Sequence, residues 1–234
     1  MSSLLAQVIE AHGGMDRWQA LRSIDARVTL SGGLYTQKGF PEGLTDVNVR
    51  IDPHQPDVSI SPYGRFDRRG FFTPERVWVE DRAGKLTEER SQPQPHFEHV
   101  RESTWDQLDR LYFTSYALWN YLTTPFLFGE RSFESEEVEP HHENGQTWRR
   151  LRVRFPAHIP THSQAQTLYF NDKGLLQRLD YTAAAPVSHY CYDHVNFNGI
   201  VFPTLRRVVR QAANGEGLAG PTAVLIQISD IRLK

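Results

Sequence analysis

The chain has 234 residues and a formal net charge of -2 at pH 7, so its composition does not favour a broad nucleic-acid-binding face, and we expect no nucleic-acid partner. Cys191 is the only cysteine, which excludes an intrachain disulfide and a zinc site built from several thiolates. No Gly/Ser-rich or charged linker divides the chain, so we predict one β-rich domain over residues 1–234.

The sequence contains no obvious export signal or membrane span. The first fourteen residues, MSSLLAQVIEAHGG, lack the positive n-region and the long apolar h-region of a secretory signal. The longest apolar stretch, 111–128, is interrupted by Ser115, Asn120 and Pro125, so we expect no integral membrane segment. With Met1 as the native start, these features predict a cytoplasmic protein.

The chain opens with a helical pattern. Residues 3–11 predict a short amphipathic helix with one apolar side formed by Leu4, Leu5, Val8 and Ile9. The run His12-Gly13-Gly14 ends it, because glycine accepts the positive φ of a helix C-terminus. Asp16 is a candidate cap for a second short helix that reaches Leu21 and buries Trp18.

The apolar period then changes to two, which is typical of strands with one wet face. We predict strands over 24–30, 47–51, 58–60, 66–72 and 77–80. Gly32-Gly33 permits a bulge or a turn, and turns are predicted at Arg69-Gly70 and 81–84. Residues 91–95 contain two prolines and predict an irregular approach to the next element.

The one long helical pattern runs from Ser103 to Phe128, and we place the helix at 104–124. Thr104 and Gln107 have the spacing of a capping box, and Pro125 forces the end. Apolar and aromatic side chains occur nearly all round this helix. Such a helix is normally enclosed rather than laid on a surface.

Strand patterns resume after the helix. Residues 132–139 are acidic and predict an edge strand, while Leu151, Val153 and Phe155 alternate with arginines. Residues 166–170 and 175–181 predict a hairpin, and 189–197, 200–209 and 224–233 complete a meander. Pro203 indicates a local edge or bulge, and the change of apolar parity in the last strand indicates a bulge near Ser229.

About ten strands with short connections predict a mainly β (α+β) fold. An antiparallel sheet of this size must curl to bury its apolar face, and the central helix fills the concavity. We therefore expect an unclosed antiparallel β-barrel around the helix, with short helices at the N-terminus.

The C-terminal run resembles a known superfamily. Leu168-Tyr169-Phe170-Asn171-Asp172-Lys173-Gly174-Leu175-Leu176, Arg178-Leu179-Asp180-Tyr181, Tyr192-Asp193 and Asn198 to Thr204 are similar to the closing meander of LolA/LolB-like lipoprotein carriers. The opening Ala11 to Gly14 with Trp18 resembles a branch of uncharacterised bacterial proteins related to them. The resemblance implies a LolA-like half-barrel with a cavity that accepts acyl chains in the carriers. The lipidation cysteine and the charged features of lipoprotein handover are absent from the pattern, so cargo and partner protein stay open.

Ten histidines raise the question of a metal site. The candidate groups are His96-Phe97-Glu98-His99, His141-His142-Glu143 and His158 to His162. None has the HExxH pattern, and Pro160 disfavours chelation along a helix face. Their loops are polar and rich in proline, so we interpret these histidines as solvated and predict no metal and no cofactor.

Two further groups have a functional and a structural interpretation. Cys191 shares strand parity with His189 and Asp193, but a buried structural cysteine explains it without catalysis. The two arginine groups suggest anion binding or solvated strand faces paired with Glu134, Glu136 or Glu139, and we prefer the second interpretation; they are Arg150, Arg152, Arg154 and Arg206, Arg207, Arg210.

No phosphate-loop, dinucleotide or nucleophile-elbow motif is present, so we assign no catalytic residue. The aromatic helix either fills the core or lines a cavity. On the second interpretation we predict binding of a hydrophobic or amphiphilic, lipid-like small molecule between sheet and helix. The predicted ligand-binding residues are Trp105, Leu108, Tyr112, Tyr116 and Trp119. An enzyme that uses the same cavity and a protein-interaction module are the alternatives.

Overall fold

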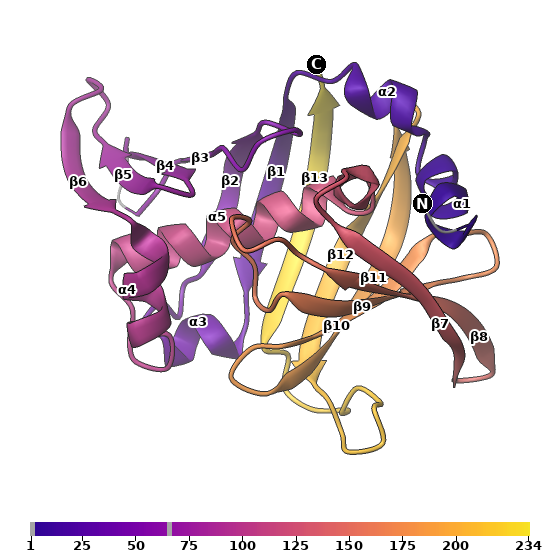
Figure 1. Ribbon diagram of the computed structural model, residues 1–234. Coiled ribbons are helices and arrows are strands. Elements are labelled where there is room, and N and C mark those ends of the chain that lie inside the picture. Colours follow the sequence, from indigo (N-terminus) through magenta and orange to yellow (C-terminus); the bar gives the residue numbers. More distant parts are fainter. Residues whose placement is uncertain (1–2, 65–66) are drawn as a thin grey trace.

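A computed structural model describes residues 3–64 and 67–234. Among these residues, thirteen strands form one antiparallel sheet in the order β6-β5-β4-β3-β2-β1-β13-β12-β11-β10-β9-β8-β7. The two end strands do not pair with each other, so the sheet stays open, and it curls around the long helix α5 (Figure 1). The mainly β class and the unclosed half-barrel predicted from the sequence are therefore confirmed.

The strands of the first half are β1 Ile24–Ser31, β2 Leu44–Ile51, β3 Val58–Ser61, β4 Arg69–Thr73, β5 Arg76–Glu80 and β6 Leu86–Ser91. Those of the second half are β7 Glu134–Glu143, β8 Gln146–Arg154, β9 Ala165–Phe170, β10 Leu176–Thr182, β11 Pro186–Phe197, β12 Ile200–Arg210 and β13 Val224–Leu233. The helices are α1 Ser3–Ala11, α2 Met15–Gln19, α3 Gly33–Gln37, α4 Pro93–Val100, α5 Gln107–Thr123 and the 3-10 helix η1 Phe126–Gly129.

The first and last strands join the two halves of the sheet. β1 pairs with both β2 and β13, so its alternating apolar side chains lie at the centre of the concave face. The β1–β13 register shifts where Arg27 faces Asp230 and Val28 faces Ile228, which leaves Ser229 as the extra residue. The bulge predicted from the parity change is confirmed, and it keeps Ile231 on the buried side.

The N-terminal helices cover one end of the half-barrel. α1 buries the four predicted residues, and Trp18 of α2 stacks on Phe126 of η1 with ring centroids 4.3 Å apart. The prediction that Asp16 caps the second helix is wrong. The N-cap residue of α2 is Gly14, which has no side chain to form a capping hydrogen bond. Its φ of 86° explains why this residue is glycine, since other residues rarely adopt a positive φ.

Helix α5 is enclosed as predicted, but its start differs. Asp106 and Asp109 form the capping box, with each carboxylate accepting a hydrogen bond from the other residue's backbone N–H at 2.8 and 3.0 Å. Arg90 of β6 pairs with both carboxylates, which explains why this box, and not Thr104 with Gln107, fixes the start. The helix ends at Thr123, before Pro125, as expected.

Three local predictions in the first half are wrong. Gly33 begins α3 instead of completing a turn, and residues 93–100 form α4, whose prolines occupy the first turn where a missing N–H costs nothing. Arg69 and Gly70 lie within β4. Gly70 marks a close approach, since a Cβ there would lie 2.6 Å from a Leu111 methyl group. Phe66, at the start of that predicted strand, lies outside the described residues.

The meander of the second half follows the predictions. Pro203 lies where β12 pairs with β11 alone, which makes it a local edge, and β7 forms one edge of the sheet. Arg152 and Arg154 of β8 lie 3.7 and 3.8 Å from Glu136 and Glu134, so these two arginines are a solvated face with acidic partners. Arg206, Arg207 and Arg210 do not form one basic group, because only Arg206 is buried on the concave side.

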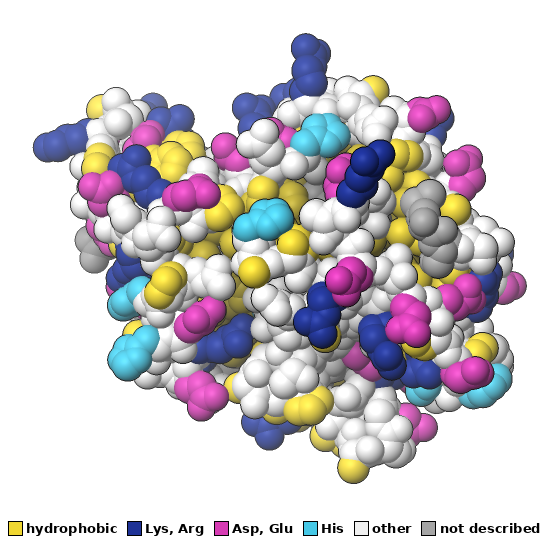
Figure 2. All heavy atoms as spheres, viewed as in Figure 1, with side chains coloured by type: hydrophobic (Ala, Val, Ile, Leu, Met, Phe, Trp, Pro, Cys, Tyr) yellow, Lys and Arg dark blue, Asp and Glu magenta, His cyan; other side chains and the backbone are white. Residues whose placement is uncertain are grey.

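Charges of both signs are interspersed over the face shown in Figure 2, with no large patch of one sign. Among the described residues, no helix combines the length and the apolar character that crossing a bilayer requires.

Candidate functional site

A cavity of about 570 Å³ lies between α5 and the concave sheet, within the range of roughly 300–1,000 Å³ typical of small-molecule pockets. Its walls come from α3, the segment 101–105, α5, the β10–β11 turn and the ends of β1, β12 and β13. The sheet side is apolar, with Leu30, Val208, Val224 and Ile226 facing the space. The segment 218–223, between β12 and β13, also lines the cavity, and Leu218 is exposed on it.

One side of α5 faces this cavity. Phe113, Ala117 and Tyr121 follow each other at intervals of four residues, so they lie on one helix face that we call the open side. Space remains because Ala117 is small and the turn opposite contributes only the three alanines at 183–185. The cavity therefore results from small side chains at matching places on two elements that are distant in sequence.

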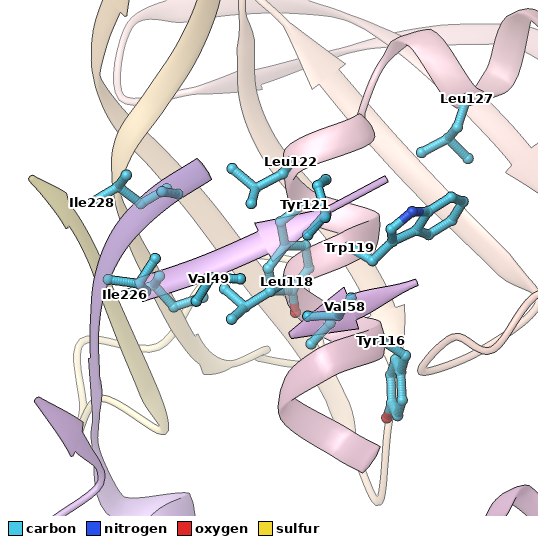
Figure 3. Close-up of a cluster of buried hydrophobic side chains, with 14 of the residues drawn as sticks. Val49, Val58, Tyr116, Leu118, Trp119, Tyr121, Leu122, Leu127, Ile226 and Ile228 are labelled. Carbon is cyan, nitrogen blue, oxygen red and sulfur yellow. The ribbon is translucent and has the colours of Figure 1, made fainter. Parts of the chain in front are cut away.

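The other side of α5 packs against β3, β4 and β5. We call it the packed side and define it by Leu111, Leu118 and Leu122, each no more than 1% exposed. Figure 3 shows Leu118 and Leu122 directed toward Val49 and Ile228, away from Tyr116 and Trp119. These side chains fill the concavity and leave no room for a ligand.

A continuous set of polar side chains runs along the helix side of the cavity. We call it the polar belt; it consists of Lys38, Arg101, His162, Tyr121 and Tyr181. The Lys38 ammonium donates to the carbonyl of Arg101 at 2.6 Å, and the Arg101 guanidinium donates to the carbonyl of His162 at 2.8 Å. His162 Nε2 lies 2.6 Å from the Tyr121 hydroxyl, which lies 3.2 Å from the Tyr181 hydroxyl. Each member thus positions the next.

Burial sets the protonation states of His162, Tyr121 and Tyr181, which we call the inner belt. Loss of hydration lowers the pKa of His162 to about 3, and the nearby Arg101 charge adds to this. Burial also raises the pKa values of Tyr121 and Tyr181 far above neutrality. A general acid or base works best with a pKa near the operating pH, so these groups suit hydrogen bonding to a ligand better than proton transfer.

The inner belt has unused hydrogen-bonding capacity. His162 Nδ1 lies 3.1 Å from the Tyr116 hydroxyl, so both ring nitrogens are engaged by tyrosines. If Nε2 accepts from Tyr121, Tyr181 donates to Tyr121 and keeps a free acceptor. In the other tautomer the chain reverses, and Tyr181 has a free O–H. Tyr181 can therefore accept from or donate to a polar group in the cavity.

Arg206 holds the helix behind the belt. It is 1% exposed, donates to the carbonyl of Tyr121 at 2.9 Å and lies over the Tyr121 ring at 5.1 Å. That carbonyl belongs to the last turn of α5, where backbone carbonyls are unpaired and the helix dipole favours a cation. Arg206 therefore serves as a C-terminal anchor of α5 and fixes the position of the Tyr121 ring.

A second cavity of about 210 Å³ lies beside the first. Its lining includes Tyr112 and Tyr116, and it shares Phe97, Arg101 and His162 with the larger cavity. Phe97 comes from α4, and its ring lies 5.2 Å from that of Tyr112. The three shared side chains are the partition between the two spaces.

The structure separates the five predicted ligand-binding residues. Trp105 lines the larger cavity, while Tyr112 and Tyr116 line the smaller one. Leu108 and Trp119 line neither, and the Trp119 indole donates to the carbonyl of Asp52 at 2.8 Å. All five are buried. Their assignment to ligand binding stays a prediction.

Sequence reasoning missed several cavity residues. Phe113, Ala117 and Tyr121 carried a usable signal, because a small residue between two aromatic residues at helical spacing leaves room at its position. The sequence around His162 gave no such signal, because its polar, proline-rich loop predicted a solvated histidine. In the structure this residue is only 4% exposed. Lys38 lies in the connection after α3, which the strand pattern did not reveal.

Of the candidate metal groups, His96, His99, His142 and His158 are exposed, as the solvated interpretation expects. Among the described residues, the one cluster of potential metal ligands is His96 with Asp106 and Asp109. Arg90 already pairs with both of these carboxylates, and they also form the capping box of α5. The cluster is therefore explained by the start of the helix.

Cys191 is buried, and burial raises the pKa of its thiol. The shared parity predicted for Asp193 is wrong, because Asp193 has a φ of 53° and turns its side chain to solvent. The sulfur lies 3.4 Å from the Arg206 guanidinium. The Cys–His–Asp arrangement therefore does not assemble, and the structural interpretation of the cysteine stands.

No protein-family model matches the sequence, and no curated protein matches it. Solved structures are similar over nearly the whole chain. A LolA superfamily protein from Nitrosomonas europaea has a TM-score of 0.54 at 10% identity, with 99% of this chain and 92% of that chain covered. A putative outer membrane lipoprotein-sorting protein domain from Vibrio parahaemolyticus has a TM-score of 0.53 at 8% identity, covering 99% and 91%.

A DUF1329 family protein from Desulfovibrio piger has a TM-score of 0.51 at 12% identity, covering 99% of this chain and 92% of that chain. These similarities show that the chain has the LolA-like fold, which confirms the resemblance read from the sequence. At such identities they show the fold alone.

Proposed function

We propose that the protein binds a lipid-like, amphiphilic small molecule in the cavity of about 570 Å³. The observation that carries the proposal is an apolar space beside a buried helix, bordered along one side by the polar belt. Burial of an aliphatic chain against the sheet supplies the driving force, at roughly 25 cal/mol per Å² of apolar surface removed from water. The belt orients the polar end.

The LolA-like fold supports this proposal, because one of the similar structures is described as a lipoprotein-sorting domain. The pKa values of His162, Tyr121 and Tyr181 favour binding over an enzyme that transfers protons through these groups near neutral pH.

Displacement of a solvatochromic dye tests the proposal. We expect Nile red to bind the wild-type chain with increased fluorescence and to be released by dodecanol, an uncharged aliphatic competitor. Ala117→Leu extends a side chain from the open side into the cavity, and we expect dye and dodecanol to bind about 5- to 150-fold more weakly, which corresponds to a cost of about 1–3 kcal/mol for overpacking the occupied cavity.

Ala83→Leu is the matched control, because Ala83 is exposed in the β5–β6 turn and does not line the cavity. We expect Ala83→Leu to leave the affinities for Nile red and for dodecanol unchanged. The proposal is wrong if the wild-type chain binds neither compound, or if Ala117→Leu binds both as tightly as the control does.

A further inference from the structure

Two cations of the polar belt lack an acidic partner. Lys38 is only 5% exposed, yet no carboxylate of the described residues lies within ion-pair distance of its ammonium group. Arg101 likewise makes no ion pair in the described part of the chain. Glu102 is the one acidic residue that lines the cavity, and it is exposed outside that distance. Burial of an ammonium group without an anion is costly.

The bonds that these cations make leave donors unused. The Lys38 ammonium has three N–H groups and donates two of them, to the carbonyls of Arg101 and Ser103 at 2.6 and 3.0 Å. The Arg101 guanidinium has five N–H groups; it donates to the His162 carbonyl and also interacts with the Tyr116 hydroxyl, which still leaves N–H groups unused. Both side chains line the cavity, so their remaining N–H groups are available to a ligand there.

The surroundings of Lys38 hold it in place. Its ammonium lies 5.4 Å from the centroid of the Trp105 ring, and the Trp105 backbone N–H donates to the Lys38 carbonyl at 3.1 Å. Loss of hydration lowers the pKa of Lys38, and the negative charge of Glu102 opposes this effect without cancelling it. A bound anion would restore the lost interaction of the charge, and the fixed carbonyls already orient the ammonium for it.

We propose that the cavity is specific for amphiphiles with an anionic headgroup, a carboxylate or a phosphate, bound between Lys38 and Arg101. The aliphatic chain then lies between the open side of α5 and the apolar strands. This inference rests on the proposed function and adds the charge of the ligand to it. An alcohol of equal chain length fills the same space but leaves both cations without an anion.

A matched ligand series tests the charge, with Kd values taken from displacement of Nile red near neutral pH. Dodecanoate is expected to bind at least about 10-fold more tightly than dodecanol, the ratio of one charge-assisted hydrogen bond. Dodecyl phosphate distinguishes the two headgroups, since whichever anion binds more tightly identifies the preferred one. Dodecyltrimethylammonium is expected to bind more weakly than dodecanol.

Two variants locate the headgroup. Lys38→Met keeps the length of the side chain without its charge, and Arg101→Gln keeps a polar group at a partly exposed position. Each is expected to reduce the dodecanoate-to-dodecanol preference several-fold while dodecanol binding stays within twofold. Arg22→Gln is the control, because Arg22 is exposed and does not line the cavity; it leaves the preference unchanged.

The outcomes separate the two proposals. Equal binding of dodecanoate and dodecanol by the wild-type chain overturns the anionic headgroup but leaves the proposed function intact, and this comparison needs no variant. An Arg22→Gln effect as large as those of Lys38→Met and Arg101→Gln also overturns it, since it indicates that anions are attracted by the surface charge of the protein and not by a site. Absence of binding by every member of the series contradicts the proposed function as well.

Discussion

The packed side and the open side of α5 are both largely covered by the rest of the chain, yet only one of them faces a cavity. Leu111, Leu118 and Leu122 pack against the sheet, where Figure 3 shows Leu118 and Leu122 directed toward Val49 and Ile228, and they fill the space. Phe113, Ala117 and Tyr121 meet alanines of the β10–β11 turn and the ends of β12 and β13, and a volume of about 570 Å³ remains. Burial of a helical side chain therefore does not distinguish core from cavity wall. The sum of side-chain volumes across two elements does.

The two sides also differ in polarity. Gly70 of β4 approaches the packed side closely, since a Cβ there would lie 2.6 Å from a methyl group of Leu111. The open side ends in the polar belt and in Arg206, which donates to the last turn of the helix. The packed half therefore holds α5 in place, and the open half carries the groups that can recognise a ligand.

The largest expected effect on stability comes from deletion of a packed-side residue. Leu111→Ala removes a fully buried side chain and leaves a hole, which is expected to lower the free energy of unfolding by about 2–5 kcal/mol. Ala117→Leu on the open side has room for its added atoms and is expected to change it by less than about 1 kcal/mol. Denaturant unfolding measures both. Equal losses would show that the open side is packed like the other.

Acid is expected to destabilise the open side next. The pKa of His162 is about 3 in the folded chain and 6.5 in the unfolded chain, so the unfolded state binds more protons between these values. Stability is thus complete above pH 6.5 and falls as the pH drops toward 3. The loss between pH 6.5 and 4.5 is up to about 3 kcal/mol for this group.

His162→Phe is expected to flatten that pH dependence, measured as the free energy of unfolding at a series of pH values. His189, whose pKa burial also lowers, keeps part of it. An unchanged slope in the variant would mean that His162 titrates normally and is not buried in a neutral state.

A smaller difference is expected at two glycines. Gly70→Ala places a Cβ 2.6 Å from a methyl group of Leu111, which overpacks the packed side and is expected to cost about 1–3 kcal/mol. Gly220→Ala, at the edge of the cavity, has nothing within 4 Å of the added Cβ and is expected to cost less than about 0.5 kcal/mol. Similar midpoints of thermal unfolding for both variants would contradict the close approach at Gly70.

Periodicity and turn chemistry were enough to predict the open half-barrel and most of its strands. The bulge at Ser229 followed from a change of parity, and the end of α5 followed from Pro125. The start of α5 did not follow, because Thr104 and Asp106 both begin acceptable capping patterns and Arg90, distant in sequence, decides between them.

The candidate site was less accessible to sequence reasoning. A helix that is apolar on all sides predicts enclosure but does not indicate on which side the neighbouring side chains are too small to fill the space. The five predicted residues therefore divide among two cavities and the core. Lys38 and His162 come from connections, where no period applies, and only the folded chain brings them to α5. The polar belt is a tertiary feature.

Fluorine NMR of the chain labelled with fluorotryptophan tests the central claim most directly, because two buried tryptophans differ in their relation to the cavity. Trp105 lines the cavity, and Trp119 lies outside it. Trp105→Phe and Trp119→Phe assign the two resonances. On addition of dodecanoate, the Trp105 resonance is expected to shift while that of Trp119 stays in place. A shift of Trp119 alone, or of neither tryptophan, would contradict a ligand on the open side of α5.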